Sequence, residues 1–210
     1  MKTQFSDIEK AKAETKGIYE RQAVTWDRQR PKVLYEKSWL DRFADKIVPG
    51  GTLLDLGCGS GDPIAGYFLA KGFRIVGVDF AKSMIELAQT RYPKADWYVQ
   101  DIRALDIIDK FDGVYSWDGF FHLSVEEQRA AIPILASYVK PEGTMLLTVG
   151  TSEGEVTGTV GGETVYHASL SADEYKMLMK ENGFDKIEYV PEDSKTLGRS
   201  VLLASQKLVT

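Results

Sequence analysis

The sequence predicts an α/β fold with a doubly wound, mostly parallel sheet. From residue 52 onward, short runs rich in β-branched and apolar residues alternate with segments of helical periodicity, which is the pattern of βαβ units. The first of these runs ends in a glycine-rich turn, LLDLGCGSGDP at 53–63, and an acidic residue ends the second. A strand, a glycine turn and a helix in this order indicate a Rossmann-like arrangement.

The expected elements follow in chain order. Two helical segments precede the sheet, one within 8–27 and one across 33–47, and Pro31 separates them because proline ends a helical pattern. Five strands follow with helices between them. We expect these strands at Thr52–Leu56, Arg74–Asp79, Asp96–Gln100, Gly113–Trp117 and Thr144–Val149.

The helices between the strands carry start and stop signals. Asp62 is predicted to cap a helix that begins at a proline and ends at Gly72. SVEE at 124–127 and SADE at 171–174 are both typical of capping boxes, and the second helix stops at Gly183.

The last third of the chain predicts a hairpin. Lys186–Val190 and Ser200–Gln206 have strand character and are separated by the turn-like PEDSKTLG. Between Gly150 and Gly162 lies a Gly/Thr/Glu-rich stretch, which we expect to form a mobile loop or a loose ribbon.

Length and composition favour one domain over residues 1–210. The chain has 43% hydrophobic residues, and no Gly/Ser/Pro-rich linker or repeat divides it. Cys58 is the single cysteine, which excludes an internal disulfide and makes a reducing compartment the default. The first residues show no apolar signal region and no stretch has the length of a membrane span, so we expect a cytoplasmic protein without membrane partners.

The net charge and its distribution argue against a nucleic-acid partner. The net charge is −5, and basic residues are scattered among acidic ones, so no basic patch for a phosphate backbone is visible. The sequence leaves a monomer and a homodimer both open.

The glycine turn and Asp79 together predict a nucleoside ligand. A strand that ends in GxGxG brings bare backbone close to a ligand. Asp79 ends the next strand about 20 positions after Gly57, where a carboxylate accepts the hydroxyls of a ribose.

Charge at the turn favours a cationic ligand over a dinucleotide. Pyrophosphate needs free backbone N–H groups and no competing anion, whereas this turn has Asp55 before it and Asp62 after it. The spacing is GxGxG, and the GK[ST] sequence of a P-loop is absent. We therefore predict S-adenosylmethionine, which carries an ammonium and a sulfonium.

From about residue 17 to 207 the chain resembles the class I S-adenosylmethionine-dependent methyltransferases. The resemblance implies a seven-stranded sheet in the order 3-2-1-4-5-7-6 with only strand 7 antiparallel. It also implies a helical N-terminal lid over 1–48, a cofactor-binding core over 49–210 and an acceptor-side loop at 150–168. The matching segments are LLDLGCGSG at 53–61, GVDFAKSMIELA at 77–88, VQDIRAL at 99–105, FDGVYSWDGFFHL at 111–123 and VKPEGTMLLTVG at 139–150.

For the methionine and ribose portions of the cofactor, the resemblance implies five contact residues. Asp55, Gly57 and Gly59 would line the methionine portion, and Tyr19 from the lid would touch its end. Asp79 would hold the ribose hydroxyls, in agreement with its position after the second strand.

For the adenine and the far side of the cofactor, the resemblance implies five more contact residues. Phe80 and Met84 would flank the adenine ring, Asp101 would meet its amino group, and the backbone N–H of Ile102 would bind the ring. Trp117, after the fourth strand, would cover the cofactor from the other side.

The reaction implied is methyl transfer to a small molecule enclosed by the lid and the 150–167 segment. It needs an aligned nucleophile and exclusion of water, and no metal. A protic acceptor also needs a base. The candidates are His167, which the resemblance favours because its loop faces the acceptor, His122, and Asp118 as a base or as an anchor for a cationic acceptor. Of the lid arginines, Arg28 or Arg30 is a candidate partner for a carboxylate of cofactor or acceptor.

Two other functions remain open at this point. A glycine turn followed by Asp79 also suits an NAD(P)-dependent oxidoreductase, although Asp62 opposes a pyrophosphate. The other is a non-catalytic module that binds S-adenosylmethionine and has lost the chemistry.

Overall fold

The computed structural model describes residues 2–208, with side chains from residue 7 onward; Met1 and residues 209–210 of the expected 1–210 domain lie outside the described residues. The helices are α1 (Lys2–Gln29), α2 (Lys37–Ala44), α3 (Ile64–Ala70), α4 (Lys82–Arg91), α5 (Val125–Ser137) and α6 (Ala172–Glu181), with short 3-10 helices η1 (Ile102–Ala104), η2 (Phe120–His122) and η3 (Ser194–Thr196). The strands are β1 (Thr52–Leu56), β2 (Arg74–Asp79), β3 (Asp96–Val99), β4 (Phe111–Ser116), β5 (Val139–Val149), β6 (Gly154–Val160), β7 (Glu163–Ser169), β8 (Phe184–Asp193) and β9 (Arg199–Lys207).

The main sheet confirms the predicted topology. Seven strands lie in the order β3-β2-β1-β4-β5-β9-β8, which is the expected 3-2-1-4-5-7-6 once the separate β6–β7 pair is set aside. The pairs among β1 to β5 are parallel, and β9 is antiparallel to both β5 and β8. The carboxyl ends of β1, β2 and β4 therefore meet at one edge of the sheet.

Two hydrophobic layers cover opposite faces of this sheet. One contains α5 and α6, with Leu135 and Met179 fully buried against the strands. The other contains α2 and α3 and includes Phe43 and Phe68, both 0% exposed. Complete burial of side chains of this size stabilises the fold by roughly 1.5–3 kcal/mol each.

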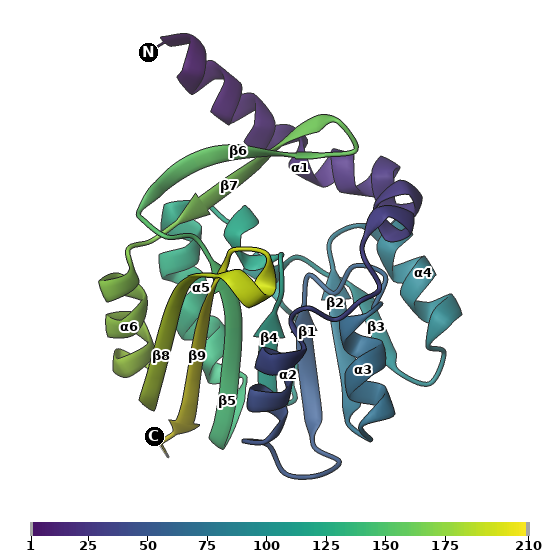
Figure 1. Cartoon of the computed structure of the whole chain (residues 1–210), viewed down its shortest axis with the longest axis vertical. Helices are drawn as coiled ribbons and strands as arrows, with labels where there is room; N and C mark the ends of the chain where they lie inside the picture. Colours follow the sequence, from purple (N-terminus) through teal and green to yellow (C-terminus); the bar gives the residue numbers. More distant parts are fainter. Residues whose placement is uncertain (1, 209–210) are drawn as a thin grey trace.

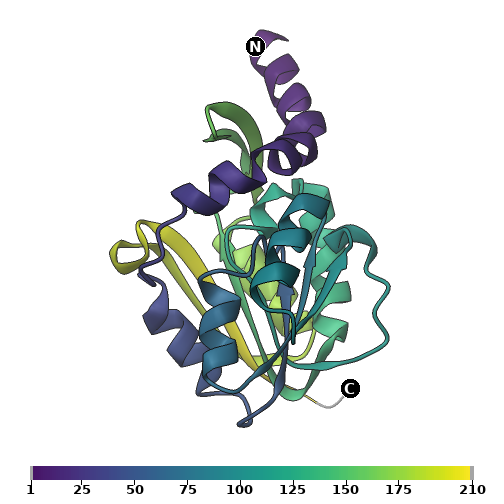
Figure 2. The ribbon, with the colours of Figure 1, turned by 90° about the vertical axis from the view of Figure 1, so that its right-hand side faces the viewer.

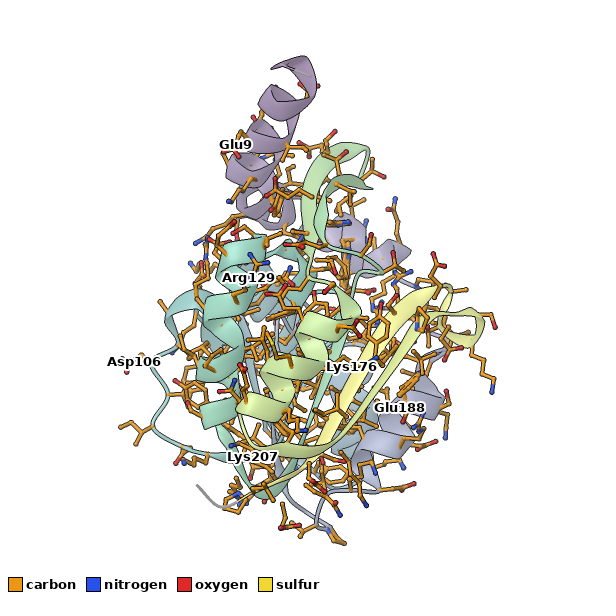
Figure 3. The ribbon with its side chains drawn as sticks, turned by 90° about the vertical axis from the view of Figure 1, so that its left-hand side faces the viewer. Glu9, Asp106, Arg129, Lys176, Glu188 and Lys207 are labelled. Atoms are coloured by element: carbon orange, nitrogen blue, oxygen red, sulfur yellow. The ribbon has the colours of Figure 1, made fainter. Side chains whose placement is uncertain are left out.

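Side-chain pairing also joins the two helices of the α5–α6 face. Arg129 extends from α5, as the side-chain view shows (Figure 3), and its Nε donates to Glu174 of α6 at 2.5 Å. The same guanidinium donates to Glu153, next to the β6–β7 ribbon, at 2.7 Å.

The carboxyl edge of the sheet is covered by α1 and by the β6–β7 ribbon. Both lie across the top of the molecule, and the amino-terminal part of α1 extends beyond the body (Figures 1 and 2). Ile18 and Ala23, each 1% exposed, anchor the helix on the domain beneath it. The expected lid is therefore one long helix followed by the short α2, and Pro31 lies in the break between them.

The strands at 52–56 and 74–79 are as predicted, whereas the others differ at their ends. β5 begins at Val139 instead of residue 144, and β4 runs from Phe111 to Ser116, which leaves Trp117 just after the strand. The 150–168 segment is a two-stranded antiparallel ribbon, in line with the ribbon alternative and not with a loop.

Two of the helix starts differ from the prediction. Asp62 does not cap α3, and this helix begins at Ile64 without a side-chain cap. The Asp62 carboxylate pairs with Lys32 at 2.8 Å instead. Ser171 accepts the N–H of Glu174 at 3.2 Å, but Glu174 binds Arg129 and does not complete a capping box.

The capping box at Ser124 is confirmed. Its hydroxyl accepts the N–H of Glu127 at 3.2 Å, and the Glu127 carboxylate accepts the N–H of Ser124 at 2.8 Å. This start fixes α5 directly after η2, the short helix that carries one of the candidate histidines.

Candidate functional site

The glycine turn after β1 forms the floor of the candidate site. Gly57, Gly59 and Gly61 have φ angles of +70°, +53° and +73°, which side chains disfavour and glycine adopts freely. The N–H groups of Gly57 and Cys58 both donate to the carbonyl of Val78, at 2.8 and 3.0 Å. The turn is thereby fastened to the end of β2.

Asp79 joins β2 to the same turn. Its Oδ2 accepts the N–H of Gly59 at 2.9 Å, and its Oδ1 accepts the N–H of Ala81 at 2.8 Å. Burial raises the pKa of this carboxyl to about 6. Each carboxylate oxygen accepts more than one hydrogen bond, so both retain an acceptor position for a ligand hydroxyl.

A cavity opens above the turn, where a ligand site is expected in an open α/β sheet. Eight of the ten residues that we expect to contact the cofactor line this cavity. They are Tyr19, Gly57, Gly59, Asp79, Phe80, Met84, Ile102 and Trp117, of which Ile102 follows β3 and Trp117 follows β4. Asp118 and His122 lie in the same wall.

Trp26 of α1 also lines this cavity, although it was not among the residues predicted from the sequence. A Cβ placed on Gly59 would lie 3.3 Å from the Trp26 ring, so the indole rests directly over the turn. Trp26 is seven residues after Tyr19, which places both side chains on one face of the helix. That spacing is the signal that could have identified it.

Asp55 lies one layer deeper than expected, in the wall of a small adjoining cavity. It is 4% exposed, and its Oδ2 accepts the hydroxyl proton of Tyr115 at 2.8 Å. Burial raises the pKa of Asp55 to about 7, and the charge of Asp79 adds to the rise. Gly57, Trp117, Arg30 and Asp62 line the same small cavity.

Asp101 does not line either cavity. Its carboxylate accepts Nε of Arg103 at 2.8 Å and the N–H of the same residue at 3.0 Å, and these bonds lower its pKa. The carboxylate expected at the adenine is thus bound by the neighbouring Arg103, and Ile102 lines the cavity.

His122 is held in one tautomer by its two partners. The carbonyl oxygen of Tyr166 lies 2.8 Å from Nδ1 and only accepts, so Nδ1 carries the proton. Nε2 then accepts the hydroxyl proton of Tyr19 at 2.8 Å. Burial lowers the pKa of His122 to about 4, which keeps the ring neutral near pH 7.

His167 lies next to His122. It belongs to β7, and its ring packs on Phe121 and His122 with centroids 4.6 and 4.9 Å apart. Burial lowers its pKa. It does not line the cavity above the glycine turn; it lines a second cavity beside it.

Asp118 forms an ion pair with Arg199, which begins strand β9. Nε and Nη2 of Arg199 donate to its two carboxylate oxygens, at 2.9 and 3.0 Å. Arg30 lies 3.9 Å from the same carboxylate and donates to Glu36 at 2.7 Å. The charge of Asp118 is therefore compensated, which weakens its expected roles as a base or a cation anchor. No feature of the sequence pointed to Arg199.

Hydrogen bonds join helix α1 to the rest of the domain on both sides of the cavity. Glu20 accepts the hydroxyl proton of Ser83 at 2.6 Å, at the start of α4. Asp27 accepts from Ser60 at 2.5 Å and from both terminal nitrogens of Arg91 at 3.0 and 2.8 Å. Because Ser60 belongs to the glycine turn, these hydrogen bonds join helix α1 directly to the turn.

The second cavity has a volume of about 270 Å³ and lies between α1, η2, the ribbon and β9. It shares Tyr19, Trp26 and Asp118 with the cavity above the glycine turn. A larger cavity of about 560 Å³ under the ribbon continues from it through Phe121, His167 and Arg199. The site therefore consists of adjoining chambers, one at the turn and the others beneath the ribbon.

The sheet order, the glycine turn and Asp79 define a class I methyltransferase fold and site. The comparisons agree: the family described as "Methyltransferase domain" matches residues 53–143. Over these residues the chain is similar to methyltransferases, and its fold is that of the class I S-adenosylmethionine-dependent methyltransferases.

Relatives of known sequence are similar over part of their length. A protein of Invertebrate iridescent virus 6 that is named as a methyltransferase is 37% identical over 40% of this chain and 31% of its own. An O-methyltransferase of Pyrenophora dematioidea is 27% identical over 68% of this chain and 57% of its own. The matches thus span about a third to somewhat over half of these relatives.

Solved structures share the fold at low identity. CalS10, an amino pentose methyltransferase of Micromonospora echinaspora with bound S-adenosylmethionine, has a TM-score of 0.68 and 19% identity and covers 89% of this chain and 96% of its own. The Burkholderia thailandensis 1,6-didemethyltoxoflavin-N1-methyltransferase has a TM-score of 0.68 and 18% identity, with coverages of 94% and 91%. In the part of this chain that the structure describes, no helix has the length and apolar character to cross a membrane.

Proposed function

We propose that this protein transfers the methyl group of S-adenosylmethionine to a small-molecule acceptor. One observation carries the proposal: the cavity at the glycine turn adjoins a second cavity, and the two share Tyr19, Trp26 and Asp118. A donor in the first and an acceptor in the second would meet at these residues. S-adenosylmethionine, when bound, supplies a methyl group activated by a positively charged sulfur.

The residues present fit the nucleoside part of this cofactor. Asp79 offers an acceptor position on each oxygen for the two ribose hydroxyls. Phe80 and Met84 provide the apolar faces for adenine, and Ile102 its backbone N–H. A Cβ on Gly59 would lie 3.3 Å from the Trp26 ring, so only glycine lets the lid helix pack this closely over the turn.

The small cavity beside Asp55 fits the amino-acid end. Trp117 Nε1 is buried there without a hydrogen-bond partner, and a buried donor without a partner is costly. We assign this N–H to the carboxylate of the cofactor. Asp55 and Asp62, in the same wall, suit its ammonium group.

Tyr19 and His122 are placed to take a proton from the acceptor. The Tyr19 hydroxyl donates to His122 Nε2, so its oxygen still has lone pairs for a proton donor in either cavity. S-adenosylmethionine would supply the methyl group; the acceptor proton would pass to Tyr19 Oη and the tyrosine proton to His122 Nε2.

His167 is a second candidate base and faces only the acceptor side. Its pKa is lowered by burial, so it is neutral and able to accept a proton at pH 7. The enclosing α1 and ribbon favour an acceptor of small size. A cytoplasmic location, the absence of nucleic-acid and membrane partners, and a monomer or homodimer stay predictions from the sequence.

The test has two stages with the purified full chain. S-adenosylhomocysteine and NADH are first titrated by calorimetry, and the proposal expects binding of the first only. The protein is then incubated with methyl-labelled S-adenosylmethionine and a panel of small alcohols, amines, thiols and carboxylic acids, with release of S-adenosylhomocysteine as the readout.

His122→Gln separates chemistry from binding. It should keep the affinity for S-adenosylhomocysteine and reduce turnover by about 10²–10⁴-fold, the usual contribution of a general base. Binding of NADH alone would reject the proposal. Tight S-adenosylhomocysteine binding with no transfer to any acceptor class would support the non-catalytic module instead.

A further inference from the structure

The wall of the second cavity carries two arginines. Arg30 comes from the end of α1 and Arg199 from the start of β9, about 170 residues apart in the chain, and both line this cavity. Arg30 has a side chain that is 8% exposed and Arg199 one that is 36% exposed. Tertiary structure has therefore brought two cations to one cavity.

Most of the hydrogen-bonding capacity of these arginines is unused. A guanidinium donates five N–H bonds, but among the described residues Arg30 makes one, to Glu36. Arg199 makes two to Asp118 and a long one of 3.4 Å to the carbonyl of Leu197. Several N–H groups of each arginine thus remain available to a ligand.

These spare donors have open space to face. Among the described residues, the side-chain atoms that are buried without any partner are Oε2 of Glu36, Nε1 of Trp117 and Oγ1 of Thr144. No guanidinium nitrogen belongs to this group, and both arginines line the second cavity, so their unused N–H groups can meet a ligand there.

Each arginine has one carboxylate partner. Arg199 binds Asp118, and Arg30 binds Glu36, which is fully buried behind it, at 2.7 Å. Of these two carboxylates only Asp118 lines the cavity, and His167 is neutral because burial lowers its pKa. The wall therefore presents two guanidinium groups and one carboxylate, and the free N–H groups suit a ligand with acceptor oxygens.

Aromatic side chains form much of the rest of the wall. Phe121 and His167 pack edge to face at 4.6 Å, and Tyr35 and Trp26 also line the chamber. Such walls suit a planar ring, and a guanidinium fork suits the planar oxygens of a carboxylate.

We infer that the methyl acceptor is a small planar molecule with a carboxylate, which Arg30 and Arg199 bind in this cavity. The inference rests on the proposed methyl transfer and adds the class of acceptor. Arg199 lines the second cavity and the chamber under the ribbon but not the cavity above the glycine turn. A carboxylate on Arg199 therefore leaves the remainder of the molecule free to reach Tyr19, where the two cavities meet.

The test uses the full chain saturated with S-adenosylhomocysteine and three probes of one shape: benzoate, benzamide and benzylamine. Calorimetry should detect benzoate with an affinity at least about tenfold above that of benzamide, because a charge-assisted bond to an arginine contributes that much. Benzylamine should not bind. Failure of S-adenosylhomocysteine to bind would reject the proposed function, whereas its binding without a preference for benzoate would reject only the acceptor class.

Arg199→Gln identifies the residues involved. It should lower benzoate affinity about tenfold or more, and it should raise that of benzylamine because it releases the carboxylate of Asp118. Arg42→Gln is the matched control, since Arg42 binds Glu188 on the surface of α2 and does not line the cavity. Equal benzoate affinity in the two variants would overturn the inference, and so would a loss of benzoate binding in both.

Discussion

Replacement of Asp79 by Asn tests the physical basis of the cofactor site most directly. The two carboxylate oxygens accept the N–H groups of Gly59 and Ala81 at 2.9 and 2.8 Å. An amide retains one oxygen and places NH₂ where the other stood, so one buried N–H loses its acceptor. That loss costs about 1–3 kcal/mol of folding free energy, or roughly 2–4 °C in Tm for each kcal/mol in a chain of this size.

The same change should weaken cofactor binding by a separate amount. Hydrogen bonds to a charged group contribute about 1.5–3 kcal/mol each, so we expect the Kd for S-adenosylhomocysteine to rise at least about tenfold. Calorimetry at pH 7.5 measures the affinity, and thermal unfolding measures the stability.

Asp112→Asn is the control for this experiment. Asp112 accepts the N–H of Thr52 at 2.8 Å and Nζ of Lys140 at 3.0 Å, at the opposite end of the sheet from the cavities. This variant should lose stability without losing affinity. If Asp79→Asn binds S-adenosylhomocysteine within twofold of the unmodified chain, the ribose does not bind at Asp79 and the reasoning is wrong.

Three further predictions concern packing, local capping and pH. A Cβ at Gly77 would lie 2.3 Å from the Trp97 ring, so Gly77→Ala should lower Tm by several degrees, and an unchanged Tm would show that the ring moves freely. Ser124→Ala removes the confirmed cap of α5 and should cost about 1 kcal/mol in denaturant unfolding; no change would mean that the cap is not needed. The folded-state pKa of Asp79 is raised to about 6 and a ribose needs the ionised form, so affinity for S-adenosylhomocysteine should be constant above pH 7 and fall as the pH drops through 6, by up to about tenfold per unit. Burial also raises the pKa of Asp55, in the adjoining small cavity, to about 7, so calorimetry should compare the pH profile with that of Asp79→Asn, and identical profiles would contradict the assignment to Asp79.

Features that depend on local sequence were predictable. The glycine turn needs positive φ at Gly57, Gly59 and Gly61, and only glycine adopts that freely. Strand periodicity placed β1 and β2 at the correct residues, and the parallel order then brought Asp79 to the turn. The cofactor side of the site followed from these constraints.

Features that depend on competition between side chains were not predictable. Asp62 has the residue type of a cap but pairs with Lys32, which the folded chain brings to 2.8 Å. Asp101 has the position of an adenine partner, but Arg103 occupies its carboxylate. In both cases a nearby cation offers a stronger partner than the one that local sequence suggests.

The sequence by itself determined the order of strands and helices, the glycine turn and the carboxylate at the end of β2, because these depend on residues close together in the chain. Only the tertiary structure decided the acceptor side, since His122 acquires its tautomer from Tyr166, and Asp118 its partner from Arg199. These contacts join segments 44 and 81 residues apart, and the energy that selects among such pairs depends on distance and burial, which exist only once the sheet, lid and ribbon have assembled.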